Sequence, residues 1–317
     1  MEVHDLVVLA TGTHGAVPQS LGGGPVAERI TVAPEPFDIP EHVADAVKSL
    51  TTRLVANRRG STVWDVETPA GRLAVKLGYR CPPHDWTALA PARESVILRQ
   101  VIPEDVQCGE WAEGTWSAQP WREGVDLFSR WERHRARRSV PSLAEARSCA
   151  AALSALHAKG WAHGDVQPNH LLMDTACTWL IDLGLASGGG HVSGAYDFPY
   201  RGCLVHYEAP EISCGVLESG TAAPTRESDV YALGASLFIS ATGWRHVDYP
   251  DNAPREVQRR AIVGKPHRPV GIPGPLGSLI TAMMRRDPAA RPTAAQVAGS
   301  LTDSLADSLN EAAYPRP

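Results

Sequence analysis

The spacing of apolar residues changes at Gly124, and this change limits the folds open to the chain. Between residues 54 and 121, short runs alternate apolar and polar residues, as strands with one buried face do. The runs at 54–56, 62–67 and 72–78 are separated by the turn-like sequences NRRGS and TPAG, which predicts a three-stranded antiparallel meander. QCGEWAEG and TWSAQPW, between residues 107 and 121, predict two further strands.

Helical spacing dominates after Gly124. Residues 142–160 begin with Ser142-x-x-Glu145, a capping-box pattern, repeat apolar residues every three or four positions and stop at Gly160. One helix is also predicted in the first half, at residues 91–102. A small, mostly β part with one helix, followed by a larger, mostly α part, predicts an α+β fold with two lobes.

The length of the chain also favours two lobes, because 317 residues exceed the usual limit for a single hydrophobic core. Residues 1–45 are rich in glycine and proline and show little periodicity, which predicts an N-terminal extension. We expect the small lobe at residues 46–123 and the large lobe at residues 124–317.

Composition excludes several classes of function. The net charge of -5 gives no support for nucleic-acid binding, and the six cysteines lack the spacing of a zinc site or a disulfide framework. The first residues lack the basic start and long apolar core of a signal peptide, and no apolar run is long enough to cross a membrane. We therefore expect a cytoplasmic protein without nucleic-acid or membrane partners, and the composition predicts no oligomeric state.

Only four of the 30 basic residues are lysines, a bias that favours a bacterial chain.

Two aspartates each stand beside a short apolar run, in HGDVQPNH at residues 163–170 and in LIDLGLA at residues 180–186. Two carboxylates at neighbouring strand ends suit the binding of a divalent metal and a phosphate ester. The alternative is a pair of ordinary turn aspartates. Their separation of 17 residues and the flanking sequences favour the first interpretation.

The ordered series VKLG, Glu94, HGDVQPNH, DLG, EAPE, SDVYALG and RRDPAARP resembles the protein kinase family over roughly residues 50 to 302. The resemblance implies a bilobal kinase fold, with ATP as phosphoryl donor and Mg²⁺ or Mn²⁺ as metal. It assigns Lys76 to the α and β phosphates, Glu94 to the orientation of Lys76, and Asp165 to the acceptor hydroxyl. Asp182 would bind the metal, and Gly184 would allow the backbone to turn that carboxylate inward.

Other parts of the resemblance depart from the usual pattern. The turn between the first two strands has one glycine, so Arg58, Arg59, Gly60 and Ser61 are the candidates for contact with the phosphates. Gln167 stands where the family has lysine, and His170 stands where it has an asparagine that binds the second metal. Pro120 lacks an N–H, which leaves Trp121 to donate to adenine.

The resemblance also implies structural roles. Glu211 of EAPE would pair with Arg291 and anchor the activation segment, and Asp229 would hold the catalytic loop from a buried helix start. Gly164 stands where many regulated kinases have arginine, so a phosphate on the activation segment would lack its usual partner.

These features predict a kinase that phosphorylates a Ser or Thr hydroxyl of a protein or peptide, including a biosynthetic precursor peptide as one subclass. The alternatives are a small-molecule hydroxyl kinase of the aminoglycoside phosphotransferase type and an ATP-binding pseudokinase scaffold. The Glu211 and Arg291 anchor argues against the first alternative, because that type generally lacks it. Retention of four residues argues against the second: Lys76, Glu94, Asp165 and Asp182.

Overall fold

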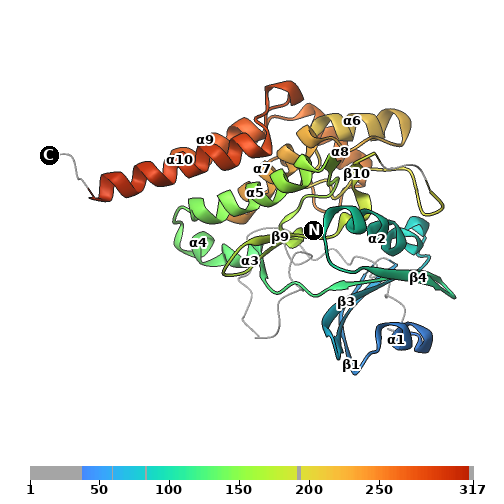
Figure 1. Ribbon diagram of the computed structural model, residues 1–317. Helices are drawn as coiled ribbons and strands as arrows, with labels where there is room; N and C mark the ends of the chain where they lie inside the picture. The colour runs from blue at the N-terminus through green and yellow to red at the C-terminus, as the bar shows by residue number, and fades with distance from the viewer. Residues whose placement is uncertain (1–37, 59, 83, 191–193, 314–317) are drawn as a thin grey trace.

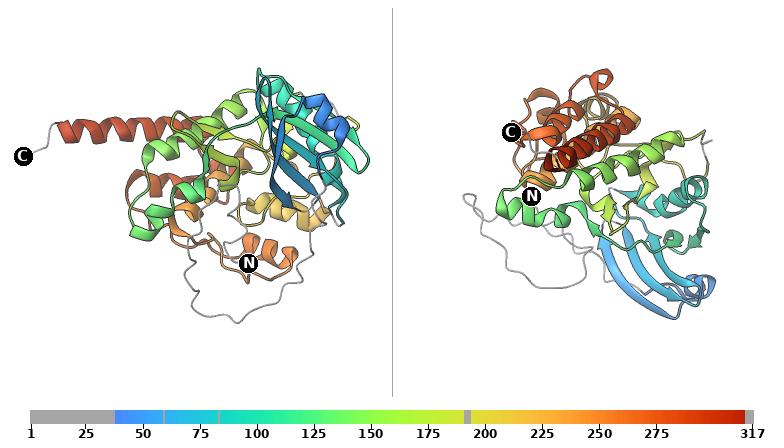
Figure 2. Two further views of the ribbon diagram at one scale, coloured as in Figure 1. Left: turned by 90° about the horizontal axis from the view of Figure 1, so that it is seen from below. Right: turned by 60° about the vertical axis from the view of Figure 1, so that its left-hand side comes forward.

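The computed structural model describes residues 38–58, 60–82, 84–190 and 194–313, and it has two lobes (Figure 1). The smaller lobe is a twisted sheet flanked by helices, and the larger lobe is mostly helical (Figure 2). The predicted α+β class and the bilobal arrangement are confirmed. Most of the predicted N-terminal extension and Arg59 lie outside the described residues.

The sheet of the small lobe is antiparallel, with the strand order β1-β2-β3-β5-β4. Its first three strands form the predicted meander, and the two further strands are also confirmed. In the centre of the sheet, Lys76 lies opposite Val63 of one neighbouring strand and Ser117 of the other. The strands are β1 (Thr51–Arg58), β2 (Ser61–Thr68), β3 (Gly71–Gly78), β4 (Gln107–Trp111) and β5 (Gly114–Pro120).

Two helices pack on this sheet. Helix α1 (Glu41–Val47) buries Val43 and Val47 in a cluster with Trp64, Val75 and other sheet residues. Because of this packing, α1 belongs to the small lobe, although the division of the chain at residues 45 and 123 remains a prediction. Helix α2 (Ala90–Val101) is the helix predicted at residues 91–102, whereas α1 was not predicted, and α2 follows a 3₁₀ turn at Asp85–Ala88.

Helix α2 also joins the two lobes. Its residues Ile97 and Leu98 share a buried cluster with Trp161 and Leu183 of the large lobe. Short antiparallel strands shape the inner side of that lobe, where β6 pairs with β8, β8 with β9, and β7 with β10. They are β6 (Val125–Asp126), β7 (Trp161–Ala162), β8 (Leu171–Met173), β9 (Thr178–Leu180) and β10 (Ser187–Gly188).

The helices of the large lobe surround α7, which is buried along most of its length. Its residues Leu233, Leu237 and Phe238 form the centre of the main core cluster. The helices are α3 (Leu127–Arg130), α4 (Glu132–Arg137), α5 (Leu143–Ala158), α6 (Pro210–Ser219), α7 (Arg226–Thr242), α8 (Arg255–Gly264), α9 (Gly274–Met283) and α10 (Ala294–Ala313). No helix among the described residues is long and apolar enough to cross a membrane.

The start of α5 differs from the predicted capping box. The Ser142 hydroxyl accepts a hydrogen bond from the Glu145 N–H at 3.4 Å, as predicted. The Glu145 carboxylate, however, accepts from Trp131 Nε1 at 2.8 Å and from Arg130 Nε at 2.6 Å. The reciprocal bond of the capping box is absent because the Glu145 carboxylate instead connects the first turn of α5 to the end of α3.

A group of histidines and tyrosines is buried between α7 and α8. The Tyr231 hydroxyl lies 2.8 Å from His246 Nε2 and 2.9 Å from His267 Nε2. The Tyr249 hydroxyl lies 2.5 Å from His206 Nδ1. Burial lowers the pKa of His206 and that of His246 to about 3, so both rings are neutral at pH 7.

We predict that the protein loses stability as the pH falls from about 6.5 toward about 3, because unfolded histidines take up protons with a pKa near 6.5. His206 and His246 cannot do so in the folded state, since their folded pKa of about 3 is depressed. Acid therefore favours the unfolded chain across this window. Urea unfolding at a series of pH values measures the slope.

His246→Gln should flatten that slope, whereas His42→Gln, at an exposed position on α1, should leave it unchanged. An identical slope for the parent and His246→Gln would contradict the role of the buried ring.

Candidate active site

Lys76 and Glu94 meet between β3 and α2, as the sequence predicts. Lys76 Nζ donates to Glu94 Oε2 at 2.7 Å and to Asp182 Oδ1 at 3.2 Å. Burial acts to lower the pKa of Lys76, but the carboxylates of Asp182 and Glu94 outweigh burial and raise it. The lysine is therefore charged and lies between the two carboxylates.

The second oxygen of Glu94 binds the segment that follows Asp182 and the end of the sheet. Glu94 Oε1 accepts from the Leu183 N–H at 3.2 Å and from Gln119 Nε2 at 3.4 Å. Glu94 is only 1% exposed, so these bonds are shielded from water. The sequence analysis did not identify Gln119. The sequence feature that could have pointed to it is a polar residue next to the last position of a mostly buried strand.

The backbone of Asp182, and not that of Gly184, adopts the unusual conformation. Asp182 has φ 66° and ψ 67°, in the left-handed region. Gly184 has no positive φ, and a Cβ added there would make only ordinary contacts of 3.6 Å or more. The expectation for Gly184 is therefore wrong, because the carboxylate is turned inward by its own residue and held by Lys76.

Asp229 of α7 binds the backbone of the loop that contains Asp165. Its carboxylate accepts from the N–H groups of His163 at 2.6 Å and Gly164 at 2.9 Å, and it also lies 3.0 Å from His157 Nε2. This confirms that Asp229 holds the loop. Burial lowers the pKa of His163 to about 4, so its neutral ring donates to Ile181 O and accepts from the Asp165 N–H.

Asp165 presents one oxygen without a partner. Its Oδ2 accepts from Gln167 Nε2 at 3.0 Å, whereas its buried Oδ1 has no hydrogen bond among the described residues. Burial raises the pKa of Asp165. A buried acceptor of this kind, fixed through its other oxygen by Gln167, is suited to receive a hydroxyl proton.

His170 lies between the two aspartates. Its Nδ1 lies 2.8 Å from Asp165 O, and its Nε2 lies 3.4 Å from Asp182 Oδ2. Because a carbonyl can only accept, His170 Nδ1 donates to Asp165 O, and the ring directs Nε2 at Asp182. Metal-binding histidines commonly have their other ring nitrogen bound in this way. These two side chains fit a divalent metal.

The described residues contain no group of three or more potential metal ligands. A metal held by Asp182 and His170 would need further oxygen ligands from phosphate or water, which is usual for Mg²⁺. The predicted metal pair therefore stays a prediction that the geometry favours.

The turn between β1 and β2, which contains Gly60, packs against the residues that follow β3. Gly60 has φ 86°, its carbonyl accepts from the Tyr79 N–H at 2.8 Å, and an added Cβ would lie 2.2 Å from Thr87 Oγ1. This close approach explains the glycine without a ligand. Arg58 is exposed and Ser61 begins β2, so phosphate contacts by Arg58, Gly60 and Ser61 remain predictions.

The expected role of Trp121 is wrong. Its N–H donates to Arg72 O at 3.0 Å, because pairing between β3 and β5 continues past Pro120. An adenine ring would therefore have to find its donor elsewhere in the segment between the lobes. The Trp121 ring lies beneath the Arg72 guanidinium at 4.9 Å.

The predicted anchor of the activation segment is confirmed. Arg291 donates from its two terminal nitrogens to Glu211, at 2.6 Å and 2.8 Å. The Arg291 side chain is fully buried, and such a two-bond pair is costly to break from one side.

A buried arginine on α2, absent from the sequence prediction, holds the start of the same segment. Arg93 donates to Gly184 O at 2.6 Å, to Ala186 O at 2.8 Å and to Asp197 Oδ1 at 3.1 Å. The Phe198 ring lies 5.3 Å from its guanidinium carbon. A side-chain carboxylate thus supplies the negative partner that a phosphate supplies in a regulated segment.

Comparisons with known proteins agree with this geometry. The protein kinase domain family matches residues 122–300. Serine/threonine-protein kinase PknK of Mycobacterium tuberculosis is 38% identical over 162 residues, covering 47% of this chain and 13% of that protein. Human serine/threonine-protein kinase 16 is 30% identical over 152 residues, covering 44% and 48% of the two chains. PkaB of Streptomyces coelicolor is 28% identical over 188 residues, covering 55% and 42%.

A two-lobed chain with a lysine–glutamate pair facing a strand-end aspartate has the architecture of a phosphotransferase. Because the match covers more than half of its length, the chain belongs to the protein kinase family. The chain spans less than half the length of each relative named above.

We predict that Asp182→Asn lowers phosphoryl transfer by on the order of 10²- to 10³-fold, because it removes the charge that would hold the metal. The fold should persist, since asparagine tolerates the left-handed backbone. Initial rates and thermal midpoints measure both effects, with Asp303→Asn on α10 as the control. Parental rates in Asp182→Asn would remove this residue from the site.

We also predict activity without phosphorylation of the activation segment, because Asp197 already pairs with Arg93. Phosphatase-treated enzyme, checked by mass spectrometry, should keep its rate. Asp197→Ala should lower kcat by about two- to fivefold, the effect of losing one ion pair. A large loss of activity on dephosphorylation would disprove this mechanism.

Proposed function

We propose that the protein is an ATP-dependent kinase that transfers the γ-phosphoryl group to a Ser or Thr hydroxyl of a protein or peptide. The observation that carries this proposal is the unpartnered Oδ1 of Asp165 beside the pairing of Lys76 with Glu94 and Asp182. Phosphoryl transfer depends mainly on positioning and charge stabilisation, and these groups supply both.

Each residue has a role in this proposal. Lys76 binds the α and β phosphates, and Glu94 fixes its orientation. Asp165 accepts the proton of the attacking hydroxyl, and Gln167 keeps the Asp165 carboxylate in place. Asp182 and His170 would hold Mg²⁺ or Mn²⁺, which would neutralise charge on the β and γ phosphates.

Two alternatives receive less support. A small-molecule kinase does not explain the buried pair of Glu211 and Arg291 or the contacts of Arg93. A pseudokinase scaffold does not need an unpartnered carboxylate oxygen at Asp165, since such a group is costly to bury. A biosynthetic precursor peptide remains one possible substrate, and a cytoplasmic location without nucleic-acid or membrane partners remains a prediction.

The test is incubation of the purified chain with labelled ATP and Mg²⁺ or Mn²⁺, together with protein, peptide and small-molecule hydroxyl acceptors. We expect label on Ser or Thr of proteins or peptides, and its loss in Asp165→Asn. Label on small molecules alone would select the first alternative. Nucleotide binding without transfer to any acceptor would select the pseudokinase.

We predict that the parent prefers Mn²⁺ to Mg²⁺, because imidazole suits Mn²⁺ better than Mg²⁺. His170→Asn should improve the apparent affinity for Mg²⁺ by about tenfold, the scale of changes near a metal. Metal titrations of activity, and of Mn²⁺ binding by electron paramagnetic resonance, measure the shift. Identical metal curves for the parent, His170→Asn and His170→Ala would remove His170 from the site.

A further inference from the structure

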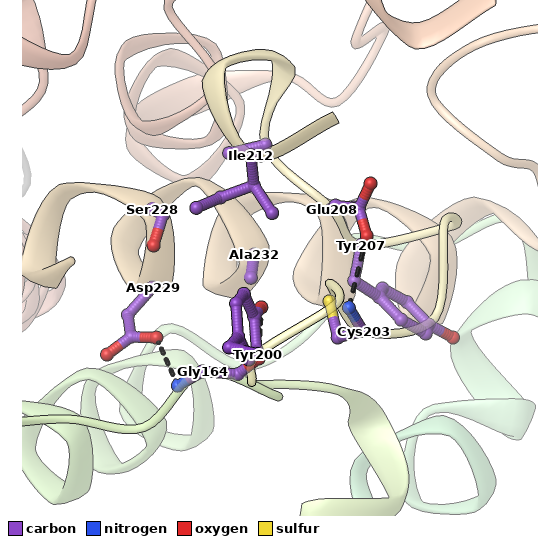
Figure 3. Close-up of a pocket in the computed structure, with 10 residues that line it drawn as sticks. Gly164, Tyr200, Cys203, Tyr207, Glu208, Ile212, Ser228, Asp229 and Ala232 are labelled. Atoms are coloured by element: carbon purple, nitrogen blue, oxygen red, sulfur yellow. Dashed lines mark hydrogen bonds between the residues drawn. The ribbon is translucent and has the colours of Figure 1, made fainter. Parts of the chain in front are cut away.

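The segment from Tyr200 to Cys203 is fixed beside the catalytic loop (Figure 3). The Tyr200 hydroxyl donates to the carbonyl of Gly164, the residue before Asp165, at 2.7 Å. Gly202 has φ 80°, and an added Cβ would lie 2.1 Å from Glu208 Oε2. The Cys203 N–H donates to the same oxygen at 3.0 Å. Arg201 is therefore held between two anchored neighbours, next to the site of phosphoryl transfer.

The side chain of Arg201 is exposed and has no ion pair among the described residues. Only its backbone is bound, through a bond of 3.0 Å from Arg259 Nη2 to Arg201 O. The described acidic groups on the surrounding elements already pair with other arginines, as in Glu208–Arg259, Asp197–Arg93, Asp248–Arg268, Asp251–Arg245 and Glu256–Arg260. The positive charge of Arg201 is thus not neutralised locally.

A second arginine, Arg255, lies on the helix whose Arg259 reaches this segment. Arg255 begins α8 and stands four residues before Arg259, so the two side chains share one side of the helix. Arg259 reaches Arg201 O, which places Arg255 one turn away.

We propose that the peptide substrate carries a carboxylate close to the acceptor hydroxyl, and that Arg201, supported by Arg255, selects it. This proposal rests on the proposed function as a protein or peptide kinase. A carboxylate opposite Arg201 satisfies a charge that has no ion pair among the described residues, whereas a lysine there meets a like charge. A phosphorylated residue is also an anion, so the experiment compares a peptide carboxylate with a peptide phosphate.

The experiment uses peptides with a single Ser and one variable residue, Glu, Lys, Ala or phosphoserine, at each position from three before to three after the Ser. We expect kcat/KM for Glu peptides to exceed that for Lys peptides by about three- to tenfold at one or two positions, the range for exposed ion pairs. Arg201→Glu should invert this ratio, and Arg201→Gln should bring it near one.

Arg255→Gln should reduce the ratio by about two- to threefold, consistent with one weaker exposed contact. The matched control is Arg147→Glu, which makes the same charge change at an exposed position on α5 and should keep the parental ratio. Circular dichroism and thermal midpoints check that each variant is folded.

Equal kcat/KM for Glu and Lys peptides at every position would overturn the proposal and leave the kinase assignment intact. A preference for phosphoserine, with Glu no better than Ala, would also overturn it and would select a phosphorylated peptide. Absence of transfer to every peptide would overturn the proposal together with the proposed function.

Discussion

The two oxygens of Glu94 connect the parts of the active site that come from different lobes. One oxygen binds Lys76 of the sheet, and the other accepts from Leu183 in the large lobe and from Gln119 at the end of β5. A single buried carboxylate therefore connects α2, Lys76 and the segment that begins at Asp182. Removing any one of these partners would leave a buried charge or N–H unsatisfied, so the arrangement is cooperative.

Three buried arginines organise the segment that follows Asp182. Arg93 holds its start, Arg259 holds its end through Glu208, and Arg291 holds the beginning of α6 through Glu211. Buried ion pairs contribute little net stability compared with apolar packing, but breaking them from one side is costly. Their effect here is to fix the start and the end of the segment and the beginning of α6.

Local patterns in the sequence predicted much of this structure. Alternation of apolar residues predicted the strands, and the motifs around Lys76, Asp165 and Asp182 predicted the residues that meet in the site. What the sequence could not predict depends on backbone geometry or distant contacts. The Trp121 N–H is bound because strand pairing extends past Pro120, and Arg93 reaches carbonyls about 90 positions away. The positive φ of Asp182, assigned in advance to Gly184, follows from its contact with Lys76.

The left-handed backbone of Asp182 has a consequence for substitutions of its partners. A non-glycine residue in this region carries about 1–2 kcal/mol of strain, which the pull of Lys76 offsets in the folded protein. Loss of Lys76 or Glu94 would therefore release the carboxylate to relax away from the site as well as deleting a charge. The position of the Asp182 carboxylate and the backbone that carries it therefore depend on the same contact with Lys76.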